Sequence, residues 1–194
     1  MYKTRPNEPP IDSSRHLDQA SVDHFVAAHH TLTYSNTVGY LVARNVDGSR
    51  NIFTEVQLDE VMGVVPDRWY LDPKRSLDEQ IATMNHQVAE YFANGQSLTL
   101  YGDALFLDID MREERLPIGT TIHIGQCILQ VTPEPHNPCA KFRDRFGQPA
   151  FVACARNKHL NLRGAYLKVL QGGIICVGDG ISVVADSNTN TRTQ

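Results

Sequence analysis

Apolar and polar residues alternate along much of the second half of the chain, and this two-residue period predicts short strands. The clearest case is Cys127–Thr132, where every second side chain is apolar. Glycine-rich turns separate similar segments. Further strands are expected at Leu98–Tyr101, Ala104–Ile109, Thr121–Ile124, Leu162–Leu170, Ile174–Val177 and Ile181–Val184. So many short strands with glycine-rich turns favour a β-barrel.

A β-hairpin is predicted in the first half of the chain. Val38–Val46 has strand composition, Asp47-Gly48 is a common two-residue turn, and Arg50–Leu58 supplies the returning strand. The two arms of this hairpin are expected to pair along their whole length.

Two stretches have the spacing of helices. Residues 17–31 place Val22, Phe25 and Val26 on one face. Residues 76–94 begin with a Ser76/Glu79 capping box and end at Asn94-Gly95, with an apolar stripe at Ile81, Met84, Val88 and Phe92. The expected fold is therefore a mixed, β-rich α+β barrel with a few peripheral helices.

A chain of 194 residues, 41% of them hydrophobic, is long enough for one domain with its own core. We expect an N-terminal arm and helix over residues 1–37, a barrel over 38–185 and a disordered polar tail over 186–194.

Composition argues against several classes of protein. A net charge of −4 and a pI near 6.0 disfavour nucleic-acid binding, which normally uses a basic surplus. No apolar run approaches the roughly 18 residues of a membrane-spanning helix. The four cysteines show no metal-type or iron–sulfur spacing, and no secretory signal precedes them, so a cytoplasmic location is expected.

The most informative chemistry follows the strand at Cys127–Thr132. Pro133, Pro135 and Pro138 lead the chain out of the sheet. Asn137 suits a helix N-cap and Pro138 the first helical position, which places Cys139 in the first turn of a short helix. A cysteine there favours the thiolate form.

Three cations follow this cysteine, at Lys141, Arg143 and Arg145. They gain nothing from the positive end of a helix, so an anionic ligand nearby would explain them. The alternative is an inert cysteine beside a solvated basic face that Asp144 partly offsets.

The histidines at 24, 29 and 30 raise the question of a metal site in the N-terminal helix. They have no acidic or cysteine partner at helical spacing, so a wet surface is the preferred interpretation.

The order of several motifs resembles that of the MOSC domain family, named after the C-terminal part of molybdenum cofactor sulfurase. The motifs are VVPDRWYL, ATMNHQVAEYF, LYGDALFLDIDMREERLPIGTTIHIG, PHNPCAKF, RFG, LRGAYLKVLQGG and VGDGISVV. They extend from about Val38 to about Val184 and resemble a stand-alone, bacterial-type member. Pro66 stands where the family usually has glycine, and Ala104 where asparagine is frequent.

The resemblance implies site residues and a cofactor. Cys139 would be the catalytic residue and the molybdenum ligand, and His136 would orient the site or move a proton, unless it is only a loop histidine bonded to the backbone. The implied binding residues for molybdenum cofactor are Asn137, Lys141, Arg143, Arg163, Gly164, Asp67, Arg68 and Asp103. For Asp67 and Arg68 a plain structural ion pair is equally compatible.

Three functions are compatible with these residues. The first is binding of molybdenum cofactor, or carriage of sulfur on Cys139, with a cysteine desulfurase (a pyridoxal phosphate enzyme) as the sulfur donor. The second is a molybdenum-dependent reductase of N-hydroxylated compounds that takes electrons from a separate redox partner. The third is a non-catalytic barrel that binds some other small anionic ligand.

Overall fold

The computed structural model describes residues 7–184. Its helices are α1 (Gln19–Ala28), α2 (His86–Ala93) and α3 (Ala140–Arg156), with 3-10 turns at Ser13–Arg15, His29–Thr31, Arg68–Leu71, Leu77–Glu79, Leu98–Leu100 and Lys158–Leu160. Its strands are β1 (Thr37–Arg44), β2 (Arg50–Phe53), β3 (Glu55–Asp59), β4 (Gly63–Val64), β5 (Ile81–Asn85), β6 (Leu105–Asp108), β7 (Thr121–Ile124), β8 (Cys127–Val131), β9 (Ala165–Gln171), β10 (Gly173–Cys176) and β11 (Ile181–Val184).

The strands form one large curled sheet and one small sheet. The large sheet has the order β11-β7-β8-β9-β5-β6-β1-β2, and the small one β10-β3-β4. Pairing is antiparallel except between β5 and β6. An isolated bridge from Thr37 to Gly180 ties the edge near β11 back to the start of β1. The sheet is therefore curled like a half-barrel, which confirms the predicted mixed, β-rich fold.

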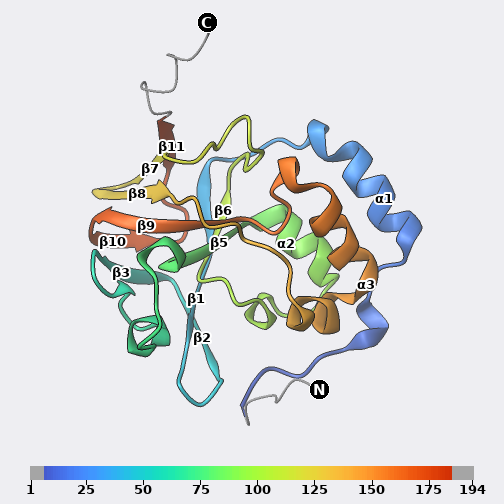
Figure 1. The fold of residues 1–194 in the computed structure, drawn as a ribbon, viewed down its shortest axis with the longest axis horizontal. Helices are drawn as coiled ribbons and strands as arrows, with labels where there is room; N and C mark the ends of the chain where they lie inside the picture. Colours follow the sequence, from blue (N-terminus) through green and yellow to red (C-terminus); the bar gives the residue numbers. More distant parts are fainter. Residues whose placement is uncertain (1–6, 185–194) are drawn as a thin grey trace, which may run out of the picture.

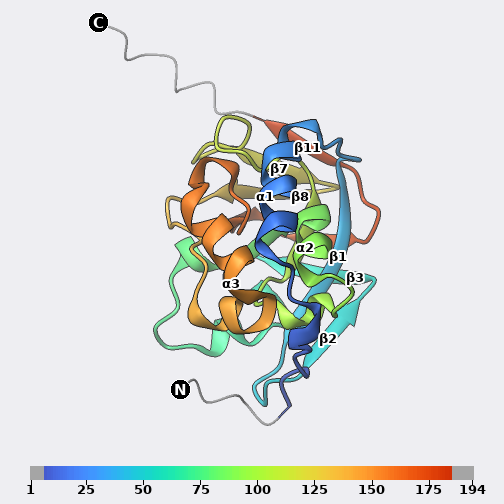
Figure 2. The ribbon, with the colours of Figure 1, turned by 90° about the vertical axis from the view of Figure 1, so that its right-hand side faces the viewer.

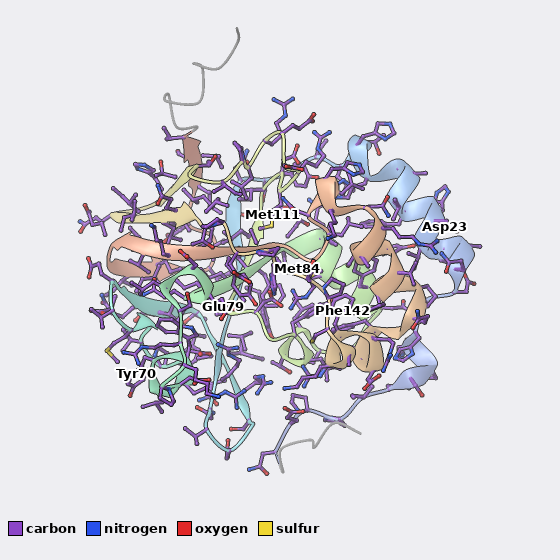
Figure 3. The ribbon with its side chains drawn as sticks, in the orientation of Figure 1. Asp23, Tyr70, Glu79, Met84, Met111 and Phe142 are labelled. Atoms are coloured by element: carbon purple, nitrogen blue, oxygen red, sulfur yellow. The ribbon has the colours of Figure 1, made fainter. Side chains whose placement is uncertain are left out.

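All three α-helices lie on one side of the large sheet (Figure 1). Figure 2 looks onto that side and shows them in front of the strands. The sheet separates two cores because successive side chains of a strand point to opposite faces. In β6, Leu105 and Leu107 enter the barrel core, and Phe106 enters the core beneath the helices. Met84 of β5 and Phe142 of α3 meet in this second core (Figure 3).

The predicted hairpin is confirmed at its turn. Asn45 N–H donates to Ser49 O over 2.9 Å, and Gly48 has a φ of 103° that favours glycine. The returning arm differs from the prediction. It pairs with β1 only as far as Phe53, and β3 continues into the small sheet beside β10.

The long helix predicted over residues 76–94 is wrong in its first half. Ile81–Asn85 is strand β5 at the centre of the large sheet, and only His86–Ala93 is helical. A central strand is buried on both faces, so its apolar residues lack the alternation that marks a half-exposed strand. Asn85 accepts a hydrogen bond from Val88 N–H and caps α2, and Asn94 ends it in the left-handed conformation.

Two smaller predictions also change. Leu98–Leu100 is a 3-10 turn capped by Ser97 rather than a strand. The N-cap of α3 is Cys139 rather than Asn137, and Gly147, with φ 89°, breaks α3 into two segments. The short helix predicted after Pro138 therefore continues, past this break, as far as Arg156.

The ends of the chain are only partly described. Residues 7–16 of the predicted arm lie against the body of the protein, whereas residues 1–6 and the predicted disordered tail from 186 fall outside the described residues. Among the described residues, no helix combines the length and the apolar character needed to cross a membrane.

We predict that Gly164→Ala destabilises the fold strongly. Gly164 has a φ of +91°, and a Cβ at this position would overlap the backbone carbonyl of Thr83. A loss of about 3–5 kcal/mol in the free energy of unfolding is expected in urea titrations. Gly180→Ala, with open space around its Cβ, is the matched control and should cost less than about 1 kcal/mol. Equal losses in the two variants would contradict this account.

Candidate functional site

A small cavity of about 100 Å³ lies where the β1–β2 hairpin, the 100–102 loop and the start of α3 meet. Cys139 stands at its edge, and Tyr101, Phe142 and Phe146 provide apolar wall. Six cationic side chains line the same space: Arg44, Arg50, Arg68, Lys141, Arg145 and Arg163. A surface so rich in positive charge is suited to an anionic ligand.

Arg44 is held in place by a buried carboxylate. Asp67, only 2% exposed, accepts from Arg44 Nε at 2.9 Å and from Nη2 at 2.8 Å. It also accepts from the backbone N–H of Arg44 and of Trp69. Asp67 therefore positions Arg44 and caps the turn at Arg68–Leu71, and it has little capacity left for a ligand.

Arg163 is held in a similar way. Its Nη1 lies 2.8 and 2.9 Å from the two carboxylate oxygens of Asp103, which is fully buried. Its guanidinium also lies over the ring of Phe142, 5.3 Å from the centroid. Asp103 is thus the counter-ion of Arg163, while the buried Nε of Arg163 has no hydrogen-bond partner.

Arg145 is buried at the floor of the site, with 6% of its surface exposed. Its Nη1 donates to Leu100 O over 2.6 Å, and its Nη2 pairs with Glu8 at 3.0 Å. The aromatic cluster of Tyr101, Phe142 and Phe146 packs in the core beside it. These contacts hold Arg145 in one position.

Arg50, like Arg68, donates to backbone carbonyls and has no carboxylate partner among the described residues. Its Nη1 donates to Gly48 O over 2.5 Å, and its buried Nε has no hydrogen-bond partner. Burial, together with the positive charges of Arg145 and Arg44, lowers the pKa of Arg50 to about 10. A bound anion would relieve both the repulsion and the missing hydrogen bond.

Cys139 is the cysteine that lines this cavity. It is exposed, lies at the N-cap of α3 and accepts Arg143 N–H at its carbonyl. The other three cysteines are less suited to chemistry. Cys127 and Cys154 are buried, and burial raises the pKa of the Cys154 thiol to about 12. Cys176 is half-buried, and burial raises its pKa as well.

His136 lies behind the cavity as a neutral imidazole. Its side chain is 5% exposed, its Nδ1 is 3.7 Å from Asp103 Oδ1, and its ring packs against Tyr166 with centroids 4.3 Å apart. Burial, and next the charge of Arg163, lowers the pKa of His136 to about 3. A histidine that is uncharged at neutral pH fits an orienting role better than that of a proton donor.

Two further cavities adjoin the cationic one at Arg44. One, of about 220 Å³, also shares Gly102 and Arg163 and is lined by Glu79, His136 and Tyr166. The other, of about 400 Å³, shares Arg68 and runs past Trp69. A ligand larger than a single anionic group therefore has space on either side of Arg44.

The sequence-predicted site residues separate into three groups. Cys139, Lys141, Arg68 and Arg163 line the cationic cavity. Asp67, Asp103 and His136 lie behind it, and Gly164 allows close contact with the Thr83 backbone. Asn137 and Arg143 are exposed, and Arg143 Nη2 pairs with Asp144 Oδ1 at 3.1 Å. The structure therefore does not place Asn137 or Arg143 around this cavity.

The sequence motifs do not single out Arg44 or Arg50, and they mark Arg145 only as one of three cations after Cys139. A signal for the first two is present in the hairpin. Arg44 and Arg50 are directly opposite each other next to the turn, where like charges destabilise a strand pair. Two arginines that face each other beside the turn of a predicted hairpin therefore indicate an anion nearby.

No group of three or more metal-ligating side chains occurs within residues 7–184, the part of the chain that the structure describes. The wet surface predicted for the three histidines holds for His24 and His30, which are exposed, and is wrong for His29, which is only 3% exposed. The donor set at the cavity is one thiol surrounded by cations. Such a set fits an anionic cofactor that carries its own metal and leaves one position for a sulfur ligand.

Comparison with known proteins places these residues in context. A family model described as MOSC domain matches residues 51–182. A protein named "Reductase" from Gibberella moniliformis (strain M3125 / FGSC 7600) is 34% identical over 84 residues, which are 43% of this chain. The matched part is 14% of the length of that relative.

Solved structures share the fold at low identity. The YUAD protein from Bacillus subtilis matches with a TM-score of 0.58 and 17% identity, over 77% of this chain and 96% of its own. YiiM from Escherichia coli matches with a TM-score of 0.53 and 18% identity, over 77% of this chain and 70% of its own. These likenesses concern the fold alone.

We predict that Asp103→Asn is strongly destabilising, because it leaves the guanidinium of Arg163 buried without its counter-ion. A loss of about 3–5 kcal/mol in the free energy of unfolding is expected in urea titrations. Asp144→Asn, which breaks a pair that is about half exposed, is the matched control and should cost less than about 1 kcal/mol. A loss below about 1 kcal/mol for Asp103→Asn would show that the buried pair does not hold the site.

His136 predicts a pH dependence of stability. Its pKa falls from about 6.5 in the unfolded chain to about 3 in the fold, so the unfolded state binds the proton first as the pH drops. The contribution of His136 is therefore complete above pH 6.5 and is lost progressively down to about pH 3. His136→Gln should flatten the plot of unfolding free energy against pH in this window, by at most about 1.4 kcal/mol per pH unit.

The control for this experiment is His24→Gln, which removes an exposed imidazole on α1. Chemical denaturation at half-unit pH steps supplies the slopes. An identical slope in wild type and His136→Gln would mean that the imidazole is not buried as a neutral group.

Proposed function

Because the chain belongs to the MOSC domain family, which is associated with molybdenum cofactor, we propose that it binds this cofactor and that Cys139 supplies the reactive sulfur. The observation that carries the proposal is that Cys139 and six cations line one cavity. Two of these cations, Arg50 and Arg163, have a buried Nε without a hydrogen-bond partner.

The cations would hold the phosphate of the cofactor. Arginine offers paired N–H groups that match phosphate oxygens, and Arg44 and Arg163 are held by carboxylates behind them, so little freedom is lost on binding. Lys141 adds a further positive charge beside Cys139. The adjoining cavities at Arg44 give space for the part of the ligand beyond its phosphate.

Cys139 would act as a thiolate, which is both the nucleophile and a soft metal ligand. When bound, the cofactor supplies a redox-active molybdenum. As a sulfur carrier, the Cys139 thiolate attacks the outer sulfur of a persulfide on a donor. The donor S–S bond breaks, the S–S bond of the Cys139 persulfide forms, and the donor leaves as a thiolate. The transfer therefore needs no external oxidant, and a cysteine desulfurase is the proposed donor.

A second candidate function rests on the matched relative. The protein named "Reductase" shares 84 aligned residues with this chain. Under this second candidate function, this chain would bind molybdenum cofactor and reduce N-hydroxylated compounds with electrons from a separate redox protein. The cysteines in this chain have no spacing for an iron–sulfur cluster, which supports an external electron donor. A barrel that binds another anion without catalysis is the third candidate.

We predict that Cys139→Ser removes the chemistry and leaves the fold intact, since Cys139 is exposed and its side chain makes no capping hydrogen bond. The wild type, made in a host that synthesises molybdopterin, should contain molybdenum near one atom per chain or a 32 Da adduct on Cys139. The variant should show neither, with its free energy of unfolding within about 0.5 kcal/mol of wild type.

Elemental analysis and intact-mass spectrometry provide both measurements. Cys176→Ser is the matched control, because Cys176 is also partly accessible but lies outside the cavity. Molybdenum would favour cofactor binding or the reductase, and the adduct alone would favour the sulfur carrier. If the wild type carries neither molybdenum nor the adduct, only the non-catalytic anion-binding barrel remains as a candidate. If Cys139→Ser carries as much molybdenum or adduct as wild type, Cys139 is not the reactive group.

A further inference from the structure

The segment from residue 7 to residue 16, which we call the N-terminal strap, lies against Arg145, one of the residues that line the cationic cavity. Asn7 Nδ2 donates to Asp47 Oδ2 over 2.9 Å and ties its start to the β1–β2 hairpin. Asp12 N–H donates to Gln96 Oε1 over 2.9 Å, and Asn94 Nδ2 donates to Arg15 O over 2.9 Å. The strap precedes residues 51–182, which match the family model, so the family match does not account for its presence.

The end of the strap is fitted to α3 as well. His16 Nε2 lies 3.1 Å from Arg145 O, and a Cβ at Gly147 would lie 3.0 Å from His16 Cβ. Gln96 Nε2 donates to the same Arg145 carbonyl. The strap is thus fastened at both of its ends around the residue that lies at the floor of the cavity.

Glu8 is the residue that the strap brings to Arg145. Its side chain is 6% exposed, and its Oε2 lies 3.0 Å from Arg145 Nη2. Burying a carboxylate is costly unless a cation compensates it. The strap nevertheless places a negative charge next to a site that is otherwise positive.

The effect of Glu8 reaches beyond Arg145. Its charge raises the pKa of Arg50, whereas Arg145 and Arg44 lower it. Three of the six cations that line the cavity pair with carboxylates among the described residues: Arg44 with Asp67, Arg163 with Asp103 and Arg145 with Glu8. Asp67 and Asp103 lie in the body of the barrel, whereas Glu8 comes from the strap.

We propose that Glu8 is a resident counter-ion that sets how much negative charge the cavity accepts, and that it makes the cavity select a single phosphate group over a more highly charged anion such as pyrophosphate. This inference rests on the proposed function, because both concern an anion bound in the same cationic cavity. Glu8 acts through Arg145, which lines the cavity and pairs with Glu8 at 3.0 Å, so the cavity offers less net positive charge to each additional negative charge on a ligand. Glu8 is therefore a specificity-determining residue.

The test compares wild type with Glu8→Gln, which keeps the shape and the hydrogen-bond acceptor and removes the charge. Isothermal titration calorimetry with inorganic phosphate and with pyrophosphate, at fixed pH and ionic strength, gives two affinities for each protein. We expect Glu8→Gln to bind phosphate roughly 5- to 20-fold more tightly and to raise the ratio of pyrophosphate to phosphate affinity about fivefold. The ratio does not depend on the fraction of folded protein, so a loss of stability cannot imitate the effect.

Two further variants complete the experiment. Glu114→Gln makes the same change of net charge at a side chain that is 66% exposed and outside the cavity, and its ratio should equal that of wild type. Arg50→Met removes a cation of the cavity and should weaken phosphate binding at least tenfold in either background.

If the ratio of pyrophosphate to phosphate affinity in Glu8→Gln is within twofold of the wild-type ratio, the inference is overturned and Glu8 serves only to hold the strap in place. Unchanged phosphate binding in Arg50→Met would overturn it too, because the anion would then bind elsewhere. Absence of phosphate binding in both wild type and Glu8→Gln would overturn the inference together with the anionic cavity itself. The expected ratio change in a protein that carries neither molybdenum nor a persulfide would support Glu8 and reject the proposed function alone.

Discussion

Repulsion among positive charges is the constraint on which the candidate site depends. Six cationic side chains line a cavity of about 100 Å³. Such a cluster is stable only where negative charge compensates it and hydrogen bonds hold the guanidinium groups apart. Asp67, Asp103 and Glu8 meet this need from behind, so the guanidinium of each paired arginine keeps its position. The result is a preorganised surface for an anion, with Cys139 exposed at its edge.

The fold brings these groups together from distant parts of the chain. Arg44 ends β1, Asp103 precedes β6 and Arg163 precedes β9, while the break at Gly147 lets the first segment of α3 carry Lys141 and Arg145 to the cavity. The sheet supports the site because its two faces are packed by separate cores. Relatives with 17–18% identity share this arrangement of strands and helices, so the architecture is compatible with very different sequences. The strap with Glu8 lies outside the part that matches the family model.

The site combines one exposed reactive group with buried polar groups that support it. Cys139 is the accessible sulfur, and the neutral His136 behind it contacts Asp103 and Tyr166 rather than solvent. Among the arginines that line the cavity, Arg50 and Arg163 each have a buried Nε donor without a hydrogen-bond partner in the part of the chain that the structure describes. Since buried donors normally find acceptors, these atoms indicate where a ligand would contribute its oxygens. Arg143 follows Cys139 by only four positions, but its side chain is exposed and pairs with Asp144, so it does not line the cavity.

Local patterns in the sequence determined the strand Cys127–Val131, the turn at Asp47-Gly48 and the proximity of Cys139 to Lys141, because each involves residues within a few positions of one another. The pattern of Ile81–Asn85 predicts helix although the segment is a strand, since burial on both faces removes the alternation that identifies a strand. Tertiary structure alone decided that Glu8 faces Arg145, 137 residues away, and that Asp103 faces Arg163, 60 residues away. An ion pair of this kind becomes strong only when folding excludes water from it, and which charges are buried together depends on the whole fold.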